Sequence, residues 1–345
     1  MEEMSLSNAT EALFQGFLID GEALTNAILQ GEFKEVLRIL VASVTESVGR
    51  PFELIRQYFV TFLIIGIGAS ILKQLEHLVE NTQIQKTSFW IVYLILAKEV
   101  IALFYNAQGV VRNSLDGLLT FGKVFVPTFS AALTLASGRL TGAGYIAVLS
   151  LIIYIVDELL LLVILPITES YMLLCILGGI WQKERIEHVL VLFEKGIKLA
   201  FKGVFALITG VGLLQSMILP FVDHTKIGAA KKLIGLIPGV GNVSGTTLEM
   251  ISGSAILLKN GIGVVGVLLL LIVCAIPLLK VGMVCFIMKV TSVIYGLLGE
   301  KKLTWCMDKL SNVQIILLKT VGTAFMLFVV WILLAVYTTN QRLWS

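Results

Sequence analysis

Charged residues are scarce in this sequence of 345 residues. Aspartate, glutamate, lysine and arginine make up 14% of it, whereas an average soluble domain contains about 25%. Hydrophobic residues make up 57%, and the mean hydropathy is +0.94. A chain of this composition would aggregate in water unless much of its surface contacted lipid, so composition favours a polytopic membrane protein. The net charge of +3 gives no basis for nucleic-acid binding.

Cysteine and histidine are also rare, and their positions fit no familiar metal or redox motif. None of the four cysteines forms a C-x-x-C pair, and the three histidines are far apart. No Ser-His-Asp, Cys-His or paired-carboxylate arrangement indicates hydrolysis, and "ERIEH" at 184–188 is not the H-E-x-x-H motif. We therefore expect no enzyme activity, no cofactor and no metal site. Residues 1–10 are polar and acidic, so we expect no secretory signal there.

The sequence contains several long apolar runs. A helix needs about 20 apolar residues to cross the hydrocarbon core, and charge-free runs predict spans at Gly203–Val222, Asn260–Leu279 and Thr320–Gln341. Shorter or interrupted runs add candidates at Gln57–Leu72, Thr87–Val111, Val124–Gly138 and Leu140–Val156. Ser170–Gln182 follows Pro166 and is read as a half-helix or as the end of a broken span. The sequence thus predicts an all-α polytopic bundle of about seven spans, give or take one or two.

Two segments have the pattern of amphipathic helices. In the first, apolar residues follow helical spacing from Phe33 to Val48, and Pro51 is expected to end the helix just before the first span. This divides the chain into an N-terminal amphipathic segment, 1–56, and a transmembrane domain, 57–345. The second runs from Glu187 to Lys202 and gathers three lysines on one face. That face either meets anionic lipid at the membrane surface or is simply solvated.

Residues 231–266 are rich in glycine, which raises the question of a phosphate-binding loop. The stretch reads "GVGNVSGTTLE" from Gly239, with no Gly-Lys-Ser/Thr for a Walker A loop. The third glycine of a dinucleotide fingerprint would be one place late, and no strand precedes it. Neither motif is met, so nucleotide binding is not expected.

Membrane structure explains the same stretch better. Pro238 interrupts a helix, and the glycines that follow permit unusual backbone angles. The small residues near Gly253 would let another helix approach closely. We expect a re-entrant or interfacial hairpin over 231–260 that forms an oligomer seam or a pore wall, with a tight loop between two spans as the alternative. The candidate assembly or pore residues are Pro238, Gly239, Gly241, Gly245, Ser252, Gly253, Ser254, Lys259 and Asn260.

Two pairs of charges interrupt apolar runs: Lys98–Glu99 and Asp157–Glu158. Charged residues inside a membrane usually face the bundle interior or water. Adjacent residues point about 100° apart on a helix, so we expect neither pair to close well on itself. Lys98 or Glu99 would instead pair with Asp157 or Glu158 across helices. The alternative is that these charges mark the ends of spans.

The block from Gly228 to Lys280 resembles the stage III sporulation protein AE family. The resemblance rests on six short motifs and extends more loosely over nearly the whole chain. These motifs are Ala229–Lys231, Ile237–Gly241, Ser252–Ala255, Leu257–Asn260, Gly263–Gly266 and Cys274–Pro277.

The resemblance implies an integral protein of the mother-cell membrane that surrounds the forespore of an endospore-forming bacterium. It implies a place in the channel, or feeding tube, that links the two cells. The implied partners are other proteins of the stage III sporulation A operon, including ring-forming proteins and a secretion-type ATPase, and indirectly stage II sporulation protein Q. It assigns no catalytic residues. We expect an oligomer in the lipid bilayer that scaffolds or lines the conduit.

A self-sufficient secondary transporter or permease is the alternative. It would use the intramembrane charges as a substrate or proton site in a cavity near the bilayer midplane. A lipid-modifying enzyme is disfavoured, because the sequence has no catalytic constellation.

Overall fold

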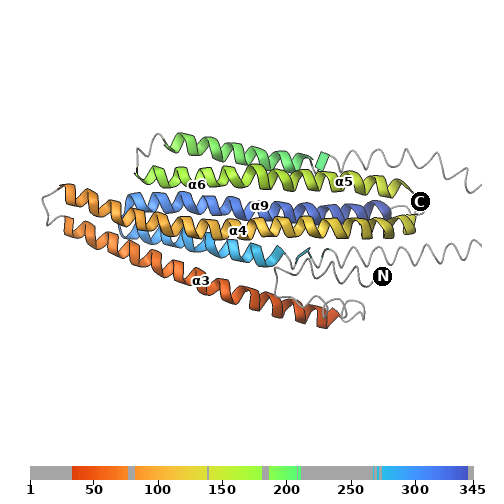
Figure 1. Ribbon diagram of the computed structural model, residues 1–345, viewed down its shortest axis with the longest axis horizontal. Helices are drawn as coiled ribbons and strands as arrows, with labels where there is room; N and C mark the ends of the chain where they lie inside the picture. Colours follow the sequence, from red (N-terminus) through yellow and green to blue (C-terminus); the bar gives the residue numbers. More distant parts are fainter. Residues whose placement is uncertain are drawn as a thin grey trace, which may run out of the picture. The chain divides into compact units, whose positions relative to one another are not determined.

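The computed structural model describes residues 33–76, 82–137, 140–180, 186–207, 209–210, 267, 270–271 and 274–340. These residues are helical apart from the short turn at 298–300 (Figure 1). The elements are α3 (Phe33–Glu76), α4 (Thr82–Ser137), α5 (Leu140–Leu159), the π-helix η1 (Leu160–Ile164), α6 (Leu165–Ile180) and α9 (Lys301–Asn340). Two further helices occupy residues 186–207 and 274–297. The all-α prediction is confirmed for this part of the chain.

The chain folds into two compact units. It passes from one unit to the other after Gly117, Asp157, Lys198, Leu271 and Thr323. The first unit takes in α3, the first two-thirds of α4, α6, the start of the 186–207 helix, the 274–297 helix and the first half of α9. The second takes in α5 (Leu140–Leu159 but for its last two residues) and the later parts of α4 and α9. The contacts described below lie within the first unit.

Five helical stretches among the described residues are long and apolar enough to cross a membrane. They are Ile55–Leu75, Lys86–Pro127, Ser150–Ile180, Cys274–Leu297 and Lys301–Leu333. The predicted count of about seven is not confirmed. The predicted span Gly203–Val222 and the predicted hairpin 231–260 lie wholly or largely outside the described residues.

Two predicted helix ends were wrong, and each involves a proline. The structure continues α3 through Pro51 and the α5–η1–α6 helix through Pro166, and α4 likewise continues through Pro127. A proline inside a helix costs about 3 kcal/mol, but a full break at membrane depth would leave several backbone groups without partners. Continuing the helix is therefore the smaller cost. Thr87–Val111 and Val124–Gly138 consequently belong to one helix.

The π-helix explains how the chain accommodates Pro166. η1 ends two residues before the proline, and the backbone N–H of Leu165 donates to the carbonyl of Leu160. This five-residue spacing widens the turn where a proline ring would otherwise press on the carbonyl four residues earlier. The predicted break at Pro166 is thus replaced by a local widening of a continuous helix.

The turn between the 274–297 helix and α9 ends one helix and starts the next within three residues. Glu300 N–H donates to the Tyr295 carbonyl at 3.1 Å, and Gly299 N–H donates to the Gly296 carbonyl at 3.2 Å. These two bonds form a Schellman motif, which needs a left-handed residue that glycine supplies most easily; Gly299 has φ 77°. Lys73 of α3 donates to the Gly299 carbonyl at 2.7 Å and lies 3.4 Å from Glu300 Oε1. The turn is therefore fixed to the end of α3.

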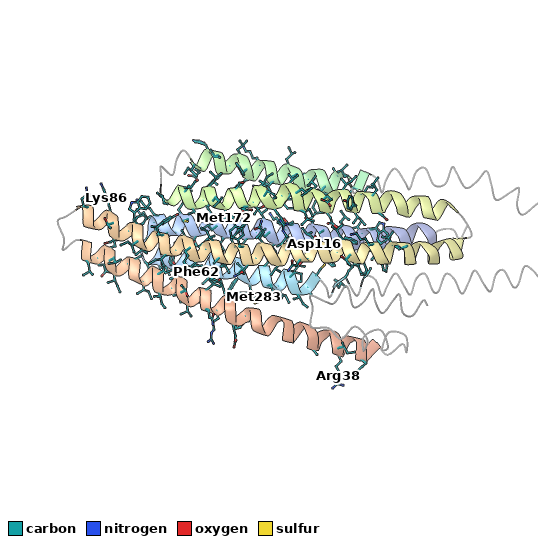
Figure 2. All side chains as sticks on the ribbon, in the orientation of Figure 1. Arg38, Phe62, Lys86, Asp116, Met172 and Met283 are labelled. Atoms are coloured by element: carbon teal, nitrogen blue, oxygen red, sulfur yellow. The ribbon has the colours of Figure 1, made fainter. Side chains whose placement is uncertain are left out.

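Close packing between α3 and the 274–297 helix depends on one glycine. Tyr295 is fully buried, and its hydroxyl donates to the Phe62 carbonyl of α3 at 2.7 Å. The Tyr295 ring then lies over Gly66, where an added Cβ would be 2.3 Å from ring atom Cε1. Phe62 itself is fully buried, as is Met172 of α6 (Figure 2). A small residue thus forms the hole for an aromatic side chain, as is common between membrane helices.

We predict that Gly66→Ala destabilises the protein by about 1–3 kcal/mol, because the hydrogen bond of Tyr295 prevents its ring from moving away. Thermal unfolding in detergent, followed by size-exclusion chromatography of the soluble fraction, measures the effect. Gly68→Ala is the matched control, since an added Cβ there meets nothing within 4 Å. It should be neutral or gain up to about 1 kcal/mol from helix propensity. Equal effects of the two substitutions would contradict the packing.

Candidate functional site

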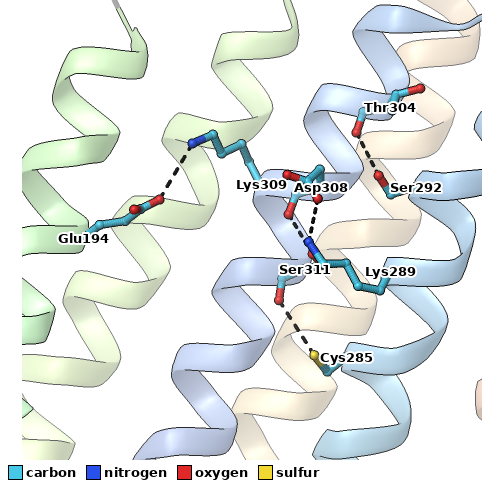
Figure 3. Close-up of polar contacts among 8 residues, drawn as sticks. All are labelled: Glu194, Cys285, Lys289, Ser292, Thr304, Asp308, Lys309 and Ser311. Carbon is cyan, nitrogen blue, oxygen red and sulfur yellow. Dashed lines mark hydrogen bonds and ion pairs between the residues drawn. The ribbon is translucent and has the colours of Figure 1, made fainter. Parts of the chain in front are cut away.

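Two adjacent charges on α9, Asp308 and Lys309, connect this helix to two different neighbours (Figure 3). The Lys289 ammonium of the 274–297 helix donates to Asp308 Oδ1 at 2.5 Å. Lys309 Nζ lies 3.7 Å from Glu194 Oε1 of the 186–207 helix. Because consecutive residues diverge by about 100° around a helix, a single dipeptide can reach both partners.

The buried surface of α9 explains why these charges lie inside the unit. Buried residues recur at spacings of four and three from Leu303 to Trp331. They are Leu303, Met307, Leu310, Gln314, Leu317, Val321, Ala324, Phe328 and Trp331. This is the seam of a helix packed on its neighbours, and the dipeptide lies between its second and third members. We call these nine residues the α9 seam.

The Lys309–Glu194 pair is the more enclosed of the two ion pairs. The side chains of Lys309 and Glu194 are 15% and 26% exposed, whereas those of Lys289 and Asp308 are 44% and 48% exposed. Glu194 also accepts a hydrogen bond of 2.7 Å from the Tyr171 hydroxyl of α6. Low exposure reduces screening, so this pair should contribute more than a surface pair.

Neutral contacts continue the attachment of α9 to the 274–297 helix on both sides of the ion pair. Ser292 Oγ donates to the Thr304 carbonyl at 3.1 Å. Cys285 Sγ lies 4.0 Å from the Ser311 carbonyl, which is a weak contact (Figure 3). Together with Lys289 and Asp308, these residues fix the register of the two antiparallel helices on either side of the turn at 298–300.

A second polar centre joins α9 to α4 and α6. The Tyr93 hydroxyl of α4 donates to the Ile176 carbonyl of α6 at 2.5 Å and lies 3.3 Å from Cys306 Sγ of α9. Gly178 and Gly179 make room for it: an added Cβ would lie 2.5 Å from the Trp305 ring at the first and 2.2 Å from the Tyr93 hydroxyl oxygen at the second. Three helices therefore meet around two small residues.

These groups hold helices together. Each ionic group of the dipeptide has a partner of opposite sign within the unit. In the described part of the chain, no group of three or more histidine, cysteine, aspartate or glutamate side chains could hold a metal ion. The four cysteines are free thiols.

The charges that the sequence singled out lie elsewhere. Lys98 Nζ is 3.0 Å from Glu99 Oε1, so the expectation that this adjacent pair could not close on itself was wrong. The Lys98 side chain is 78% exposed. Because it is long and flexible, it can bend toward the next residue even though the two Cα–Cβ bonds point about 100° apart. Asp157 is fully buried and Glu158 is half-buried.

The predicted assembly element, from Pro238 to Asn260, lies outside the described residues. Sequence reasoning missed the Asp308–Lys309 dipeptide, because the charge-free run that predicts the last span begins at Thr320. The spacing of the α9 seam, which begins at Leu303, was the signal that could have found it.

We predict that removing either partner of the Lys309–Glu194 pair destabilises the protein by about 1–3 kcal/mol, because the remaining charge is left poorly solvated. The variants are Lys309→Met and Glu194→Gln, and thermal unfolding in detergent is the measurement. The double variant should cost less than the sum of the two, with a coupling of about 1 kcal/mol. Lys98→Gln is the control at an exposed pair and should change stability by less than about 1 kcal/mol. A Lys309→Met effect no larger than that of Lys98→Gln would contradict a structural role for the pair.

Comparison with known proteins gives a consistent family assignment. Residues 19–339 match the family model described as stage III sporulation protein AE. The stage III sporulation protein AE of Bacillus subtilis (strain 168) is 23% identical over 270 residues, which cover 78% of this chain and 67% of that protein. No solved structure matches. Because the family model covers all five candidate spans and the whole α9 seam, the chain belongs to the stage III sporulation protein AE family.

Proposed function

We propose that this sporulation protein is a membrane component of the channel complex between mother cell and forespore, required for endospore formation. In this role it scaffolds or lines the conduit across the envelope. The family match over residues 19–339 is the observation that carries the proposal. The five candidate spans support a location in a membrane, which we propose is the mother-cell membrane around the forespore.

The use of charge in the first unit favours a scaffold over a transporter. A transporter concentrates ionisable groups at a site near the midplane, where they bind substrate or coupling ions. Here Lys289 pairs with Asp308 and Lys309 pairs with Glu194, so each charge is neutralised by a residue of another helix. Groups that are engaged in this way support a fixed framework and are poorly placed to bind a solute.

The partners follow from the proposal and not from the geometry. They are the other proteins of the stage III sporulation A operon, including ring-forming proteins and a secretion-type ATPase. Stage II sporulation protein Q of the forespore would be reached indirectly. The chain itself would act as an oligomer in the bilayer, with the segment from Pro238 to Gly266 as its candidate seam or pore wall.

We predict that deleting the gene in the bacterium that encodes this chain abolishes heat-resistant spores, because late forespore development depends on the conduit. The measurement is the count of colonies after heat treatment, with fluorescence microscopy to find the stage of arrest. Re-expression of the wild-type chain and of Gly68→Leu, which adds bulk at an open position, should restore spores. Gly253→Leu should reach the membrane in normal amount but fail to restore them, and should lose the co-purifying operon proteins.

Flux measurements distinguish a channel-complex component from a secondary transporter. Purified chain in liposomes should conduct no solute by itself if it is a component of a larger complex. Intrinsic flux that is lost on Asp157→Asn or Glu158→Gln would instead indicate a transporter. Normal sporulation of the deletion strain, or of Gly253→Leu with its partners retained, would contradict the role or the seam respectively.

A further inference from the structure

The outer surface of the 186–207 helix carries lysines without an acidic partner. Lys195 and Lys198 are exposed, and neither forms an ion pair within the described part of the chain. Leu192 lies about one turn before Lys195 and is 68% exposed. All three residues belong to the first unit, and we call them the lysine face.

The 186–207 helix packs along a candidate span. The Tyr171 hydroxyl of α6 donates to Glu194 Oε1 at 2.7 Å. Nearer the other end of the contact, a Cβ added at Gly178 would lie 3.2 Å from Ile186 Cγ2. The two helices are therefore antiparallel neighbours. Since α6 is part of the candidate span Ser150–Ile180, the lysine face lies at membrane depth.

Both lysines lie too deep to reach lipid headgroups. Ile186 is level with the end of the neighbouring span, so the hydrocarbon core begins near it. Lys195 and Lys198 are about 14 and 18 Å farther along the helix. A core about 30 Å thick then continues about 12 Å beyond Lys198, whereas a lysine side chain spans only about 6 Å. Exposure of either ammonium group to hydrocarbon would be costly.

The other lysines at this depth have carboxylate partners. Lys289 and Lys309 lie 2.5 and 3.7 Å from a carboxylate oxygen. Lys98 lies 3.0 Å from one, and α4 contacts α6 on both sides of it, through Tyr93 and Tyr105. The lysine face differs from these sites, because the described residues supply no carboxylate to it.

The surface of α3 shows what a lipid-facing side of this unit is made of. Between Gln57 and Lys73, which are about 24 Å apart along the helix, every exposed side chain is apolar. They are Val60, Ile64, Ile67 and Ile71. Lipid is a suitable neighbour for this surface and an unsuitable one for the lysine face.

The N-terminal segment of the chain has the charge that complements the lysine face. Residues 1–32 contain six carboxylates and no lysine or arginine. The carboxylates are those of Glu2, Glu3, Glu11, Asp20, Glu22 and Glu32. The same segment contains leucine and phenylalanine at positions 13, 14, 17 and 18, which are able to cover Leu192. Opposite charge attracts such a segment, and pairing would remove the cost of two unpaired ammonium groups at membrane depth.

We propose that residues 1–32 dock on the lysine face of the 186–207 helix, with carboxylates against Lys195 and Lys198. The docked segment separates this side of the first unit from lipid, whereas α3 faces lipid directly. The proposal goes beyond the proposed function and does not depend on it, because it concerns a contact of the chain with its own N-terminal segment.

Photocrosslinking of the full-length chain in liposomes tests the contact. p-Benzoyl-phenylalanine is placed at Leu192 and, as the matched control, at Ile64 of α3, which is 65% exposed. Mass spectrometry of the digested chain then identifies the crosslinked peptide. We expect adducts with residues 1–32 from Leu192 and none from Ile64. Adducts of Leu192 with lipid alone, or with another part of the chain alone, would overturn the proposal.

Charge reversal tests what holds the segment in place. The double variant Lys195→Glu, Lys198→Glu should lower the yield of the Leu192 adduct at least about fivefold, because the face would then repel the carboxylates. Lys86→Glu changes an exposed lysine of α4 and should leave the yield unchanged. Adding Glu11→Lys and Glu22→Lys to the double variant should restore the adduct. An unchanged yield in the double variant, or no recovery on the second reversal, would refute docking by charge.

Discussion

Burial of the α9 seam is the constraint on which the rest of the first unit depends. In an apolar stretch of 18 residues, the share of buried residues rises from 22% within Ile55–Leu75 to 56% within Lys301–Leu333. α9 directly contacts α4, α6, the 186–207 helix and the 274–297 helix through the hydrogen bonds and ion pairs of its first three turns. Between lipid-exposed helices there is no strong hydrophobic drive to associate, so close packing and polar contacts must supply the attraction. The helix that makes most of these contacts is the one that organises the others.

Charge in the membrane acts here as a register device. Apolar side chains tolerate sliding of one helix along another, because lipid and neighbouring helices are equally apolar. An ion pair such as Lys309–Glu194 does not, since a shift of one turn would leave both charges unsolvated. The turn at Gly299 and the Lys289–Asp308 pair fix the same register from the end of the hairpin. Together these contacts fix the relative positions of α9, the 186–207 helix and the 274–297 helix.

The sequence predicted the class of the protein and most of its helical segments, because both depend on composition and local pattern. It failed where the outcome depends on a distant residue. The span predicted from Thr320 leaves out Asp308 and Lys309, and only the opposite charges on two other helices make these residues compatible with a span. Pro166 looked like a break, and only the cost of unpaired backbone in a membrane keeps the helix continuous.

Glycines illustrate the same limit at single-residue scale. Gly66 and Gly68 are two residues apart on one helix, and nothing in their local sequence separates them. Yet Gly66 lies under the Tyr295 ring and Gly68 faces open space. The difference arises from a residue more than two hundred positions away, so it belongs to the packing and not to the motif. Small-residue seams can thus be recognised in sequence, but the specific glycine that matters cannot.

Mean hydropathy conceals the division of α4 into an apolar and a polar side. The span Lys86–Pro127 has a mean hydropathy of 1.7, as a lipid-facing helix would. Its 42 residues rise about 63 Å, which exceeds the bilayer core of about 30 Å. The average is high because residues such as Val100, Leu103, Phe104, Val111 and Leu115 are apolar and buried. The exposed side chains of residues 98–117 are nevertheless polar, whereas those of residues 88–97 are apolar. Over residues 98–117 the helix thus combines an apolar side that packs on its own core with a polar exposed side. Hydropathy reports the sum of the two sides, and only the fold assigns each residue to one of them.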